Sequence, residues 1–426
     1  DRKVATEPAA PEDITSNDEL FLTGEHLEQY RHPTRDPETY WNEAIKRDPG
    51  DARCRTALGR RALSRGEFQT AAEHFETAVA RFTTRHPNPV TSEAHYHLGL
   101  TLRWLGDTER AYSFLYKATW NYEWRSCAYY QLATMDCKRR DLEAAIEHLD
   151  SSLETDSQNN KAKTLKAIVL RLLGMEEEAR EILIGLLGID PLDHWAQWEL
   201  AKLDNTTAEF LELTRNDAQT ILDLAFDYCE SEFFEDAIDL LEFHHANPVA
   251  PVAVPNPLER TPMTLYTLAF LKAMTGHDDT PDVLAEARSR PADHFFPSRL
   301  EEMMILQGFV EQGPDPLASY ALGNFLFDRR RHADAITAWE QAGDTVIPQV
   351  HRNLGIAYWN HQHDGKKAAA SYLKALKLDP SDPRLVSEFD QLSKKRNLRL
   401  ETRLAFLEER KDLVLQRDDA TVELAT

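Results

Sequence analysis

The sequence predicts an all-α protein in which helical hairpins stack into a solenoid, an α-α superhelix that is irregular in the middle. The first observation is a small residue, Gly or Ala, that recurs at positions 59, 99, 133, 167 and 201, in steps of 40, 34, 34 and 34. The second is that an Ala and a bulky residue follow at helical spacing, as Ala71 and Phe75 follow Gly59. Units of this length bury their apolar faces by stacking on their neighbours, so one large globular core is not expected.

The residue types at these positions have a packing reason. Small residues let the two helices of a pair approach closely, and the bulky residue fills the gap to the next pair. A proline such as Pro191 closes the second helix because it cannot continue the hydrogen-bond ladder. This pattern resembles the tetratricopeptide repeat (TPR), two antiparallel helices in about 34 residues. The sequence therefore predicts a TPR-type helix-turn-helix solenoid, in which an extended turn at 85–89 explains the single step of 40.

The pattern also divides the chain. An early pair is expected from a helix near 20–30 and a second helix around Trp41, and after residue 201 the period degrades. It recovers at Leu322-Gly323 and Leu354-Gly355, and a weaker pair is expected over 382–417. We therefore predict four regions: a flexible lead-in at 1–17, a regular TPR array at 18–204, degenerate helical repeats at 205–312 with a Pro-rich crossing at 247–262, and a C-terminal TPR array at 313–426 that ends inside a repeat.

Composition excludes some classes of partner. With 72 acidic and 49 basic residues the formal net charge is −23, and such a surface repels phosphate backbones, so nucleic acid is not expected as a partner. No apolar run approaches the length of about 18 residues that a membrane span needs, so no membrane partner is expected. Four cysteines have no CxxC partner, which favours a reducing compartment and a cytoplasmic protein: Cys54, Cys127, Cys137 and Cys229.

A candidate binding groove follows from the repeat. The first helix of each TPR pair lines the concave face of the array, and basic and aromatic side chains recur on the side of these helices that faces away from the second helix. Such a groove suits an acidic or aromatic-bearing peptide from a protein or an adjacent domain, while a solvated face of ordinary mixed charge remains the alternative. The candidate groove residues are Arg53, Arg60, Tyr96, Arg103, Tyr130, Lys161, Arg171, Trp195 and Trp198, accompanied by Thr56 and Thr164.

A second candidate is an aromatic turn formed by Trp120, Tyr122 and Trp124. Most aromatic residues between positions 104 and 130 are expected to pack between helices. This turn is harder to bury whole, so one or two of its rings are expected to face a ligand or a neighbouring domain. Aromatic faces also stack on sugar rings, which leaves a carbohydrate link open.

The sequence predicts no catalytic, cofactor-binding or metal-ligating residue and no enzymatic role for this chain. No nucleophile elbow, HExxH motif or phosphate loop is present. Histidines occur at spacings of one or two, as at His361 and His363, whereas two ligands on one helical face need a spacing of three or four.

Several stretches go beyond a generic TPR: residues 22–30 (LTGEHLEQY), 36–37 (DP), 47–53 (RDPGDAR) and 117–121 (KATWN). Over about residues 14–200 the chain resembles the C-terminal repeat region of large bacterial proteins that have a β-rich N-terminal domain of unknown function. The resemblance implies a TPR region appended to that domain, often near sugar-utilisation genes, and it carries no catalytic residue. It also implies that this chain is a fragment of a larger protein, as do an initial Asp in place of Met and the end inside a repeat.

The functional prediction is therefore a TPR scaffold for protein-protein or interdomain binding. The alternative is an accessory helical region of a carbohydrate-active enzyme that contributes to a sugar site.

Overall fold

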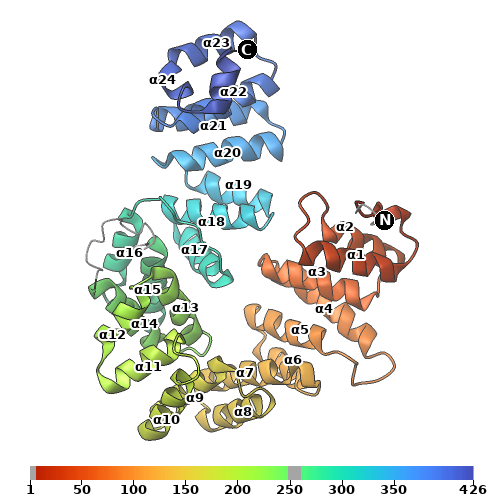
Figure 1. The fold of residues 1–426 in the computed structure, drawn as a ribbon, viewed down its shortest axis with the longest axis vertical. Helices are drawn as coiled ribbons and strands as arrows, with labels where there is room; N and C mark the ends of the chain where they lie inside the picture. Colours follow the sequence, from red (N-terminus) through yellow and green to blue (C-terminus); the bar gives the residue numbers. More distant parts are fainter. Residues whose placement is uncertain (1–5, 248–260, 426) are drawn as a thin grey trace, which may run out of the picture. The chain divides into compact units, whose positions relative to one another are not determined.

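The protein is an all-α solenoid of TPR type, described here from a computed structural model that covers residues 6–247 and 261–425. Every regular element in these two ranges is a helix, and Figure 1 shows them as successive hairpins along the chain. No helix in the same ranges combines the length and the apolar character that a membrane crossing requires. The helices form two compact units, which are described separately: unit 1 comprises residues 1–216 and 223–237, and unit 2 comprises residues 217–222 and 238–426.

Unit 1 contains six consecutive helix pairs, α1/α2 to α11/α12. In the first five pairs each helix packs most closely on its partner and then on its neighbours along the chain, whereas α11 packs on α10 slightly more than on α12. A short 3-10 helix, η1, precedes them at Pro11–Asp13. The bounds are α1 Asn17–Gln29, α2 Pro37–Arg47, α3 Ala52–Ser64, α4 Phe68–Phe82, α5 Glu93–Trp104, α6 Thr108–Ala118, α7 Tyr122–Lys138, α8 Leu142–Thr155, α9 Asn160–Leu172, α10 Glu176–Leu187, α11 His194–Asp204 and α12 Thr207–Thr214.

Two further helices belong to both units because the division of the chain falls within them. They are α13, Ala218–Cys229, and α14, Phe234–Ala246. Residues 223–237, which are the end of α13, the turn after it and the start of α14, belong to unit 1.

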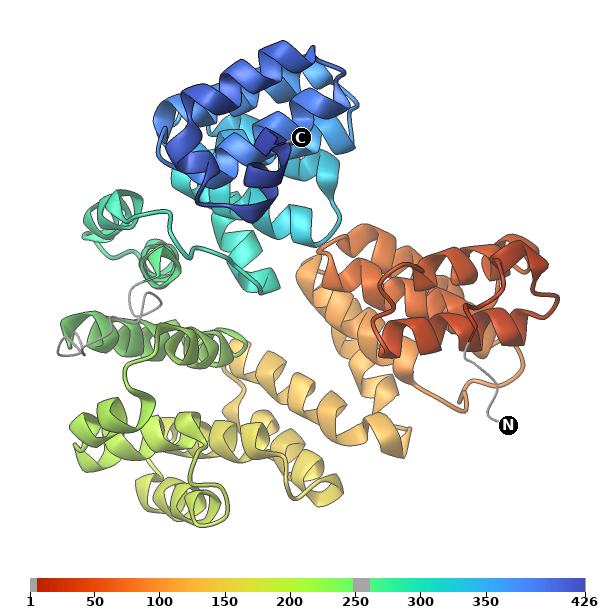
Figure 2. The same cartoon turned by 45° about the horizontal axis from the view of Figure 1, so that its top comes forward.

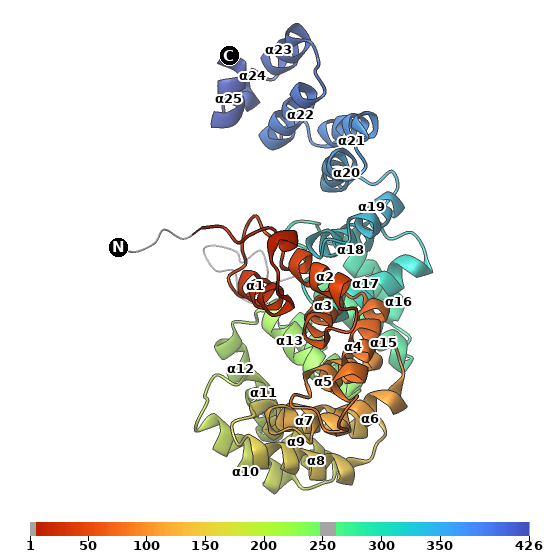
Figure 3. The ribbon, with the colours of Figure 1, turned by 90° about the vertical axis from the view of Figure 1, so that its right-hand side faces the viewer.

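Unit 2 continues the pattern after residue 238, with pairs α15/α16, α18/α19 and α20/α21 and a closing group of helices from α22 onward (Figure 3). The bounds are α15 Pro262–Thr275, α16 Thr280–Ser289, α17 Leu300–Gln312, α18 Pro316–Asp328, α19 His332–Gln341, α20 Pro348–Asn360, α21 Gly365–Leu378, α22 Pro383–Lys395, α23 Leu400–Glu409, α24 Lys411–Val414 and α25 Asp418–Ala425.

The helices begin and end where the sequence supplies caps. The side chain of Asp51 accepts a hydrogen bond from the backbone N–H of Cys54 at the start of α3, and Asp107, Asn159 and Asp193 cap α6, α9 and α11 in the same way. Gly106, at φ +77°, ends the first helix of its pair in the left-handed conformation that glycine adopts without steric cost. The turn that explains the step of 40 is confirmed, because α4 ends at Phe82 and α5 begins only at Glu93 (Figure 2).

The recurring small residue lies in close contact with the second helix of its pair. A Cβ atom added at Gly59 would lie 2.6 Å from Cε1 of Phe75, and one added at Gly355 would lie 2.6 Å from Cδ2 of Tyr372. The sequence predicted that the bulky residue would fill the gap to the next pair. Phe75 does stack on His97 of the next pair, with ring centroids 5.7 Å apart, but its ring also covers Gly59 of its own pair. Small and bulky positions are therefore complementary to each other within one hairpin.

The two ends of the chain differ from the expected pattern. Within the predicted lead-in, residues 9–14 pack on α2: the Tyr40 hydroxyl donates to the Ala9 carbonyl at 2.9 Å, and Arg47 donates to the Ile14 carbonyl at 2.6 Å. The pair predicted over 382–417 has a second helix that is interrupted between α23 and α24. The following helix, α25, was expected to open a new repeat, and it contacts α22, α23 and α24, as the first helix of a repeat contacts the pair before it.

The middle of the chain is irregular, as predicted. The second helix of the sixth pair, α12, has only 8 residues and ends in a left-handed residue, Arg215 at φ +52°. Of the Pro-rich crossing predicted at 247–262, residues 248–260 lie outside the described residues.

Candidate functional site

The candidate groove residues lie on the first helices of five consecutive pairs in unit 1, namely α3, α5, α7, α9 and α11. We call the surface that these helices present the A-helix face. Its side chains do not form one uniform surface, because the part on α3 and the part on α5–α11 have different partners. Thr56 and Thr164, which the sequence placed with this group, are both buried between helices instead.

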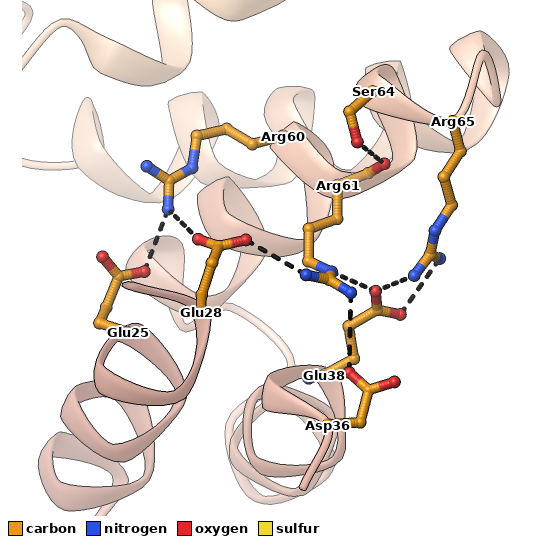
Figure 4. A network of polar contacts seen from close by, with 8 residues as sticks. All are labelled: Glu25, Glu28, Asp36, Glu38, Arg60, Arg61, Ser64 and Arg65. Atoms are coloured by element: carbon orange, nitrogen blue, oxygen red, sulfur yellow. Dashed lines mark hydrogen bonds and ion pairs between the residues drawn. The ribbon is translucent and has the colours of Figure 1, made fainter. Parts of the chain in front are cut away.

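On α3 the predicted basic residues are surrounded by carboxylates. Figure 4 shows Arg60 reaching Glu25 and Glu28 of α1, with N–O distances of 3.1 and 3.2 Å, and a third ion pair joins it to Glu93 of α5 at 3.2 Å. Burial raises the pKa of Glu25 and of Glu93 above the ordinary range, and the Arg60 guanidinium opposes that shift. This part of the A-helix face thus carries more acid than base, which the prediction from Arg53 and Arg60 alone did not include.

A second network, on α1, α2 and α3, is structural. Figure 4 shows that Arg61 and Arg65 both point to Glu38 at the start of α2, while Arg61 also contacts Glu28 and Asp36. Arg53, next to this region, pairs with Asp18 at 2.7 Å and lies over the Phe21 ring, 5.1 Å from its centroid. These contacts join α1, α2 and α3.

On α5 the predicted Tyr96 belongs to an aromatic cluster. Its ring centroid lies 5.1 Å from that of Trp124, and Trp124 lies 5.6 Å from His97. Burial lowers the pKa of His97 to about 4, so this imidazole is neutral at physiological pH. Trp124 belongs to the aromatic turn, of which one or two rings were expected to face a ligand or a neighbouring domain. The structure places it in this cluster between α5 and α7 because its ring fills the space beside His97.

From Arg103 onward the A-helix face is covered by residues 223–237 of unit 1. The Arg103 guanidinium donates to the backbone carbonyl of Glu230 at 3.2 Å and to the side-chain oxygen of Gln131. The Tyr130 hydroxyl donates to the Glu230 carboxylate at 3.3 Å. Burial raises the pKa of Tyr130 well above its usual range and lowers that of Arg103. Both predicted residues therefore face a partner from the same chain.

The α9 residues meet the same segment. Lys161 pairs with Asp227 at 2.5 Å, and Arg171 pairs with Asp236 at 2.8 Å and with Glu199 of α11 at 2.9 Å. Burial raises the pKa of Asp227 to about 6, which the neighbouring Lys161 ammonium opposes. The two cations on α9 thus each hold a carboxylate of residues 223–237.

The α11 tryptophans are buried, each with 3% of its surface exposed, and do not line an open groove. Trp195 makes an edge contact with the Tyr228 ring at 5.5 Å, and Trp198 packs on Phe210 of α12 at 5.0 Å. The Tyr228 hydroxyl donates to the buried carboxylate of Glu199. Tyr228 is thus the residue of the 223–237 segment that packs on α11, through Trp195 and Glu199.

Sequence reasoning placed these basic and aromatic side chains on one face but missed the segment that covers them. The sequence does contain a pattern that could have indicated this segment. Asp223, Asp227 and Glu230 stand at i, i+4 and i+7, a spacing that puts three carboxylates on one side of a helix opposite a row of cations.

The three residues of the aromatic turn have different surroundings in the structure. Trp120 and Tyr122 are exposed, at 58% and 69%, and lie with Tyr116 around a hollow between α6, α7 and α8. The Lys117 ammonium stands 3.6 Å from the Trp120 ring centroid. The polar lining of the hollow consists of Thr119, Arg125, Ser151, Glu154 and Thr155. Two of the three predicted rings therefore face solvent beside hydrogen-bonding groups.

Comparisons with known proteins agree with this repeat type. A family model described as tetratricopeptide repeat matches residues 56–121 and 305–345, one stretch in each unit. Similar solved structures include YrrB, a TPR protein with an unusual peptide-binding site (18% identity over 42% of this chain and 88% of that one, TM-score 0.35). Others are the Cut9–Hcn1 hetero-tetramer of the APC/C (13% identity, 98% of each chain, TM-score 0.30) and a TPR protein from Parabacteroides merdae (12% identity over 72% and 98%, TM-score 0.34).

Proposed function

We propose that this chain is a TPR scaffold that binds a protein segment on the A-helix face of unit 1. The observation that carries the proposal is that this face already holds a protein segment through the predicted residues. Arg103, Tyr130, Lys161 and Arg171 each contact a polar atom of residues 223–237. Charge-assisted hydrogen bonds of this kind recognise acidic peptides, and TPR arrays present such rows on stacked helices.

The part of the A-helix face on α3 is acidic, in contrast to the basic part on α5 to α9. Asp18, Glu25, Glu28 and Glu93 stand around Arg53 and Arg60. The contacts described above for residues 223–237 lie instead on α5 to α11. A partner that extends from the α9 end to the α3 end would therefore meet basic side chains first and acidic ones afterwards.

A photo-crosslinking experiment tests this proposal. A crosslinker placed at Arg53, whose side chain is 43% exposed, should capture a defined partner, whereas one at the exposed Glu73 on α4 should not. The purified partner should then bind at least tenfold more weakly to Lys161→Glu than to Glu73→Lys, because only Lys161 lies on the A-helix face. Equal capture at both positions, or equal affinity of both variants, would contradict the proposal.

A second candidate function rests on the hollow beside Trp120 and Tyr122. Exposed aromatic rings next to Arg125, Ser151 and Glu154 combine a stacking surface with hydrogen-bonding groups, which is the chemistry that a sugar ring requires. A glycan array tests it, with Trp120→Ala as the variant and the similarly exposed Tyr30→Ala as the control. A sugar signal that Trp120→Ala abolishes supports this site, and a blank array counts against it.

A further inference from the structure

Residues 223–237 do not contact unit 1 in the way that the other helices of the array do. Units of a solenoid contact their neighbours along the chain, and the pairs α1/α2 to α11/α12 follow this rule. Residues 223–237 make such a neighbour contact from Tyr228 to Glu199, 29 positions back, but they also reach 66 positions back to Lys161, 100 positions back to Tyr130 and 127 positions back to Arg103. Such contacts resemble those of a bound ligand more than those of the next repeat.

The segment also crosses successive first helices, as a ligand helix would. Tyr228 contacts α11, Asp227 contacts α9, and Glu230 contacts both α7 and α5. Beyond the helix, Glu232 pairs with Lys138 of α7 at 3.4 Å, and Asp236 pairs with Arg171 of α9 at 2.8 Å. One short stretch of chain thus engages four first helices.

The chemistry of the contact is specific. The segment supplies carboxylates and a phenol, and the A-helix face supplies two guanidiniums, two ammonium groups, a phenol and a tryptophan ring. Arg103 and Arg171 are held in place by Gln131 and Glu199, so their donors are oriented before the segment arrives. A pre-oriented set of donors at fixed spacing discriminates between acidic helices by the positions of their carboxylates.

We infer that the A-helix face of unit 1 selects an acidic helix in which a carboxylate, a tyrosine and a second carboxylate stand at i, i+1 and i+3, as Asp227, Tyr228 and Glu230 do. Residues 223–237 are its ligand in cis, and they compete with a partner helix of the same pattern. This inference rests on the proposed function, because it names the partner class for the same face. A tethered ligand has a high effective concentration, so a partner must exceed it in affinity or the tether must be weakened.

The test uses a fluorescein-labelled peptide of residues 217–237, with Cys229 replaced by Ser, and measures its binding to the complete chain by fluorescence anisotropy. Asp227→Ala/Glu230→Ala weakens the cis ligand and should bind the peptide at least tenfold more tightly than the wild-type chain. The matched control, Glu176→Ala/Glu178→Ala, removes two exposed carboxylates from α10 and should bind like the wild type. Adding Lys161→Glu to the weakened variant should abolish the gain. A peptide carrying Asp227→Asn and Glu230→Gln should not compete.

A second measurement decides the case if the double variant does not fold. In the wild-type chain a saturating concentration of the peptide should speed hydrogen exchange of the amides at 223–232, since the cis segment is displaced. Equal peptide affinity for all chains, or no change in exchange, overturns the inference. If a purified partner still binds in a manner that depends on Lys161 while the peptide does not bind, the proposed function stands and only the partner class is wrong.

Discussion

Replacing Gly59 by Ala should destabilise unit 1, although Ala is the better helix former. A Cβ atom added at Gly59 would lie 2.6 Å from Cε1 and 2.8 Å from Cζ of Phe75, and that ring is fully buried. Relieving the overlap requires α3 and α4 to separate or the ring to leave its position. Overpacking of this kind costs about 1–3 kcal/mol, and replacing a helical Gly returns about 0.5–1 kcal/mol, so we expect a net loss of about 1–2 kcal/mol.

The chain offers a control glycine, and it also suggests a second substitution that should compensate for Gly59→Ala. Gly185 lies inside α10, and a Cβ atom added there meets nothing within 4 Å, so Gly185→Ala should stabilise by about 0.5–1 kcal/mol. Elsewhere the chain combines Ala167 of α9 with Leu183 of α10 in one core cluster, 16 positions apart as Gly59 is from Phe75. Gly59→Ala/Phe75→Leu copies this natural combination and should recover most of the loss.

Urea unfolding followed by circular dichroism measures all three variants. The reasoning predicts that Gly59→Ala lowers the unfolding midpoint, that Gly185→Ala raises it, and that Phe75→Leu restores stability in the double variant beyond the sum of the single effects. If Gly59→Ala is as stable as Gly185→Ala, the close contact between the small and bulky positions does not determine the pairing of these helices.

Three further predictions follow from the electrostatics and the burial of single residues. Because burial raises the pKa of Asp227 from 3.8 to about 6, its contribution to stability is full below about pH 4 and is lost as the pH rises through 6. Asp227→Asn should therefore remove up to about 3 kcal/mol of pH dependence between pH 4 and 7, seen in melting temperatures, whereas the exposed control Glu176→Gln should not. Hydrogen bonds from Lys394 and Arg403 lower the pKa of Glu423 to about 2, so stability from this group is present above pH 4.5 and lost toward pH 2. Glu423→Gln should make α25 exchange its amides faster at pH 7 but leave exchange at pH 2 unchanged. Trp124→Ala should destabilise unit 1 by about 2 kcal/mol, less than the loss of a fully buried tryptophan, while Trp120→Ala should change the unfolding midpoint little, because only the half-buried Trp124 packs on Tyr96 and His97.

The repeat was predictable because its packing rule is local in sequence. Gly59 and Phe75 belong to one hairpin, so a fixed spacing reports their contact, and the pairs from α3 to α11 were predicted for this reason. The end of the chain was harder. The packing of α25 depends on Arg403, which holds Asp390 and Glu423 together across three helices. No spacing rule reports such a contact.

Of the candidate site, the A-helix face could be predicted from the sequence, but the segment that covers it could not. The basic and aromatic row on the A-helix face follows from helical projection, but its ligand comes from far along the chain. Glu230 meets Tyr130 and Arg103, which lie 100 and 127 positions before it, and pairing of this range is set by the fold. The division of the aromatic turn has a similar cause, since the half-buried Trp124 packs on His97 of the preceding pair.

The placement of residues 223–237 on the A-helix face can be tested most directly with a zero-length carbodiimide crosslinker. This reagent joins an amine and a carboxylate that are already in contact, and the Lys161 ammonium lies 2.5 Å from the Asp227 carboxylate. Mass spectrometry of the monomeric chain should find peptides joined through Lys161 and Asp227 and through Lys138 and Glu232. The Lys166–Asp150 pair, also at 2.5 Å but within the regular array, is the positive control. Recovery of the control link without either of the other two would contradict the account, because residues 223–237 would then not occupy this face.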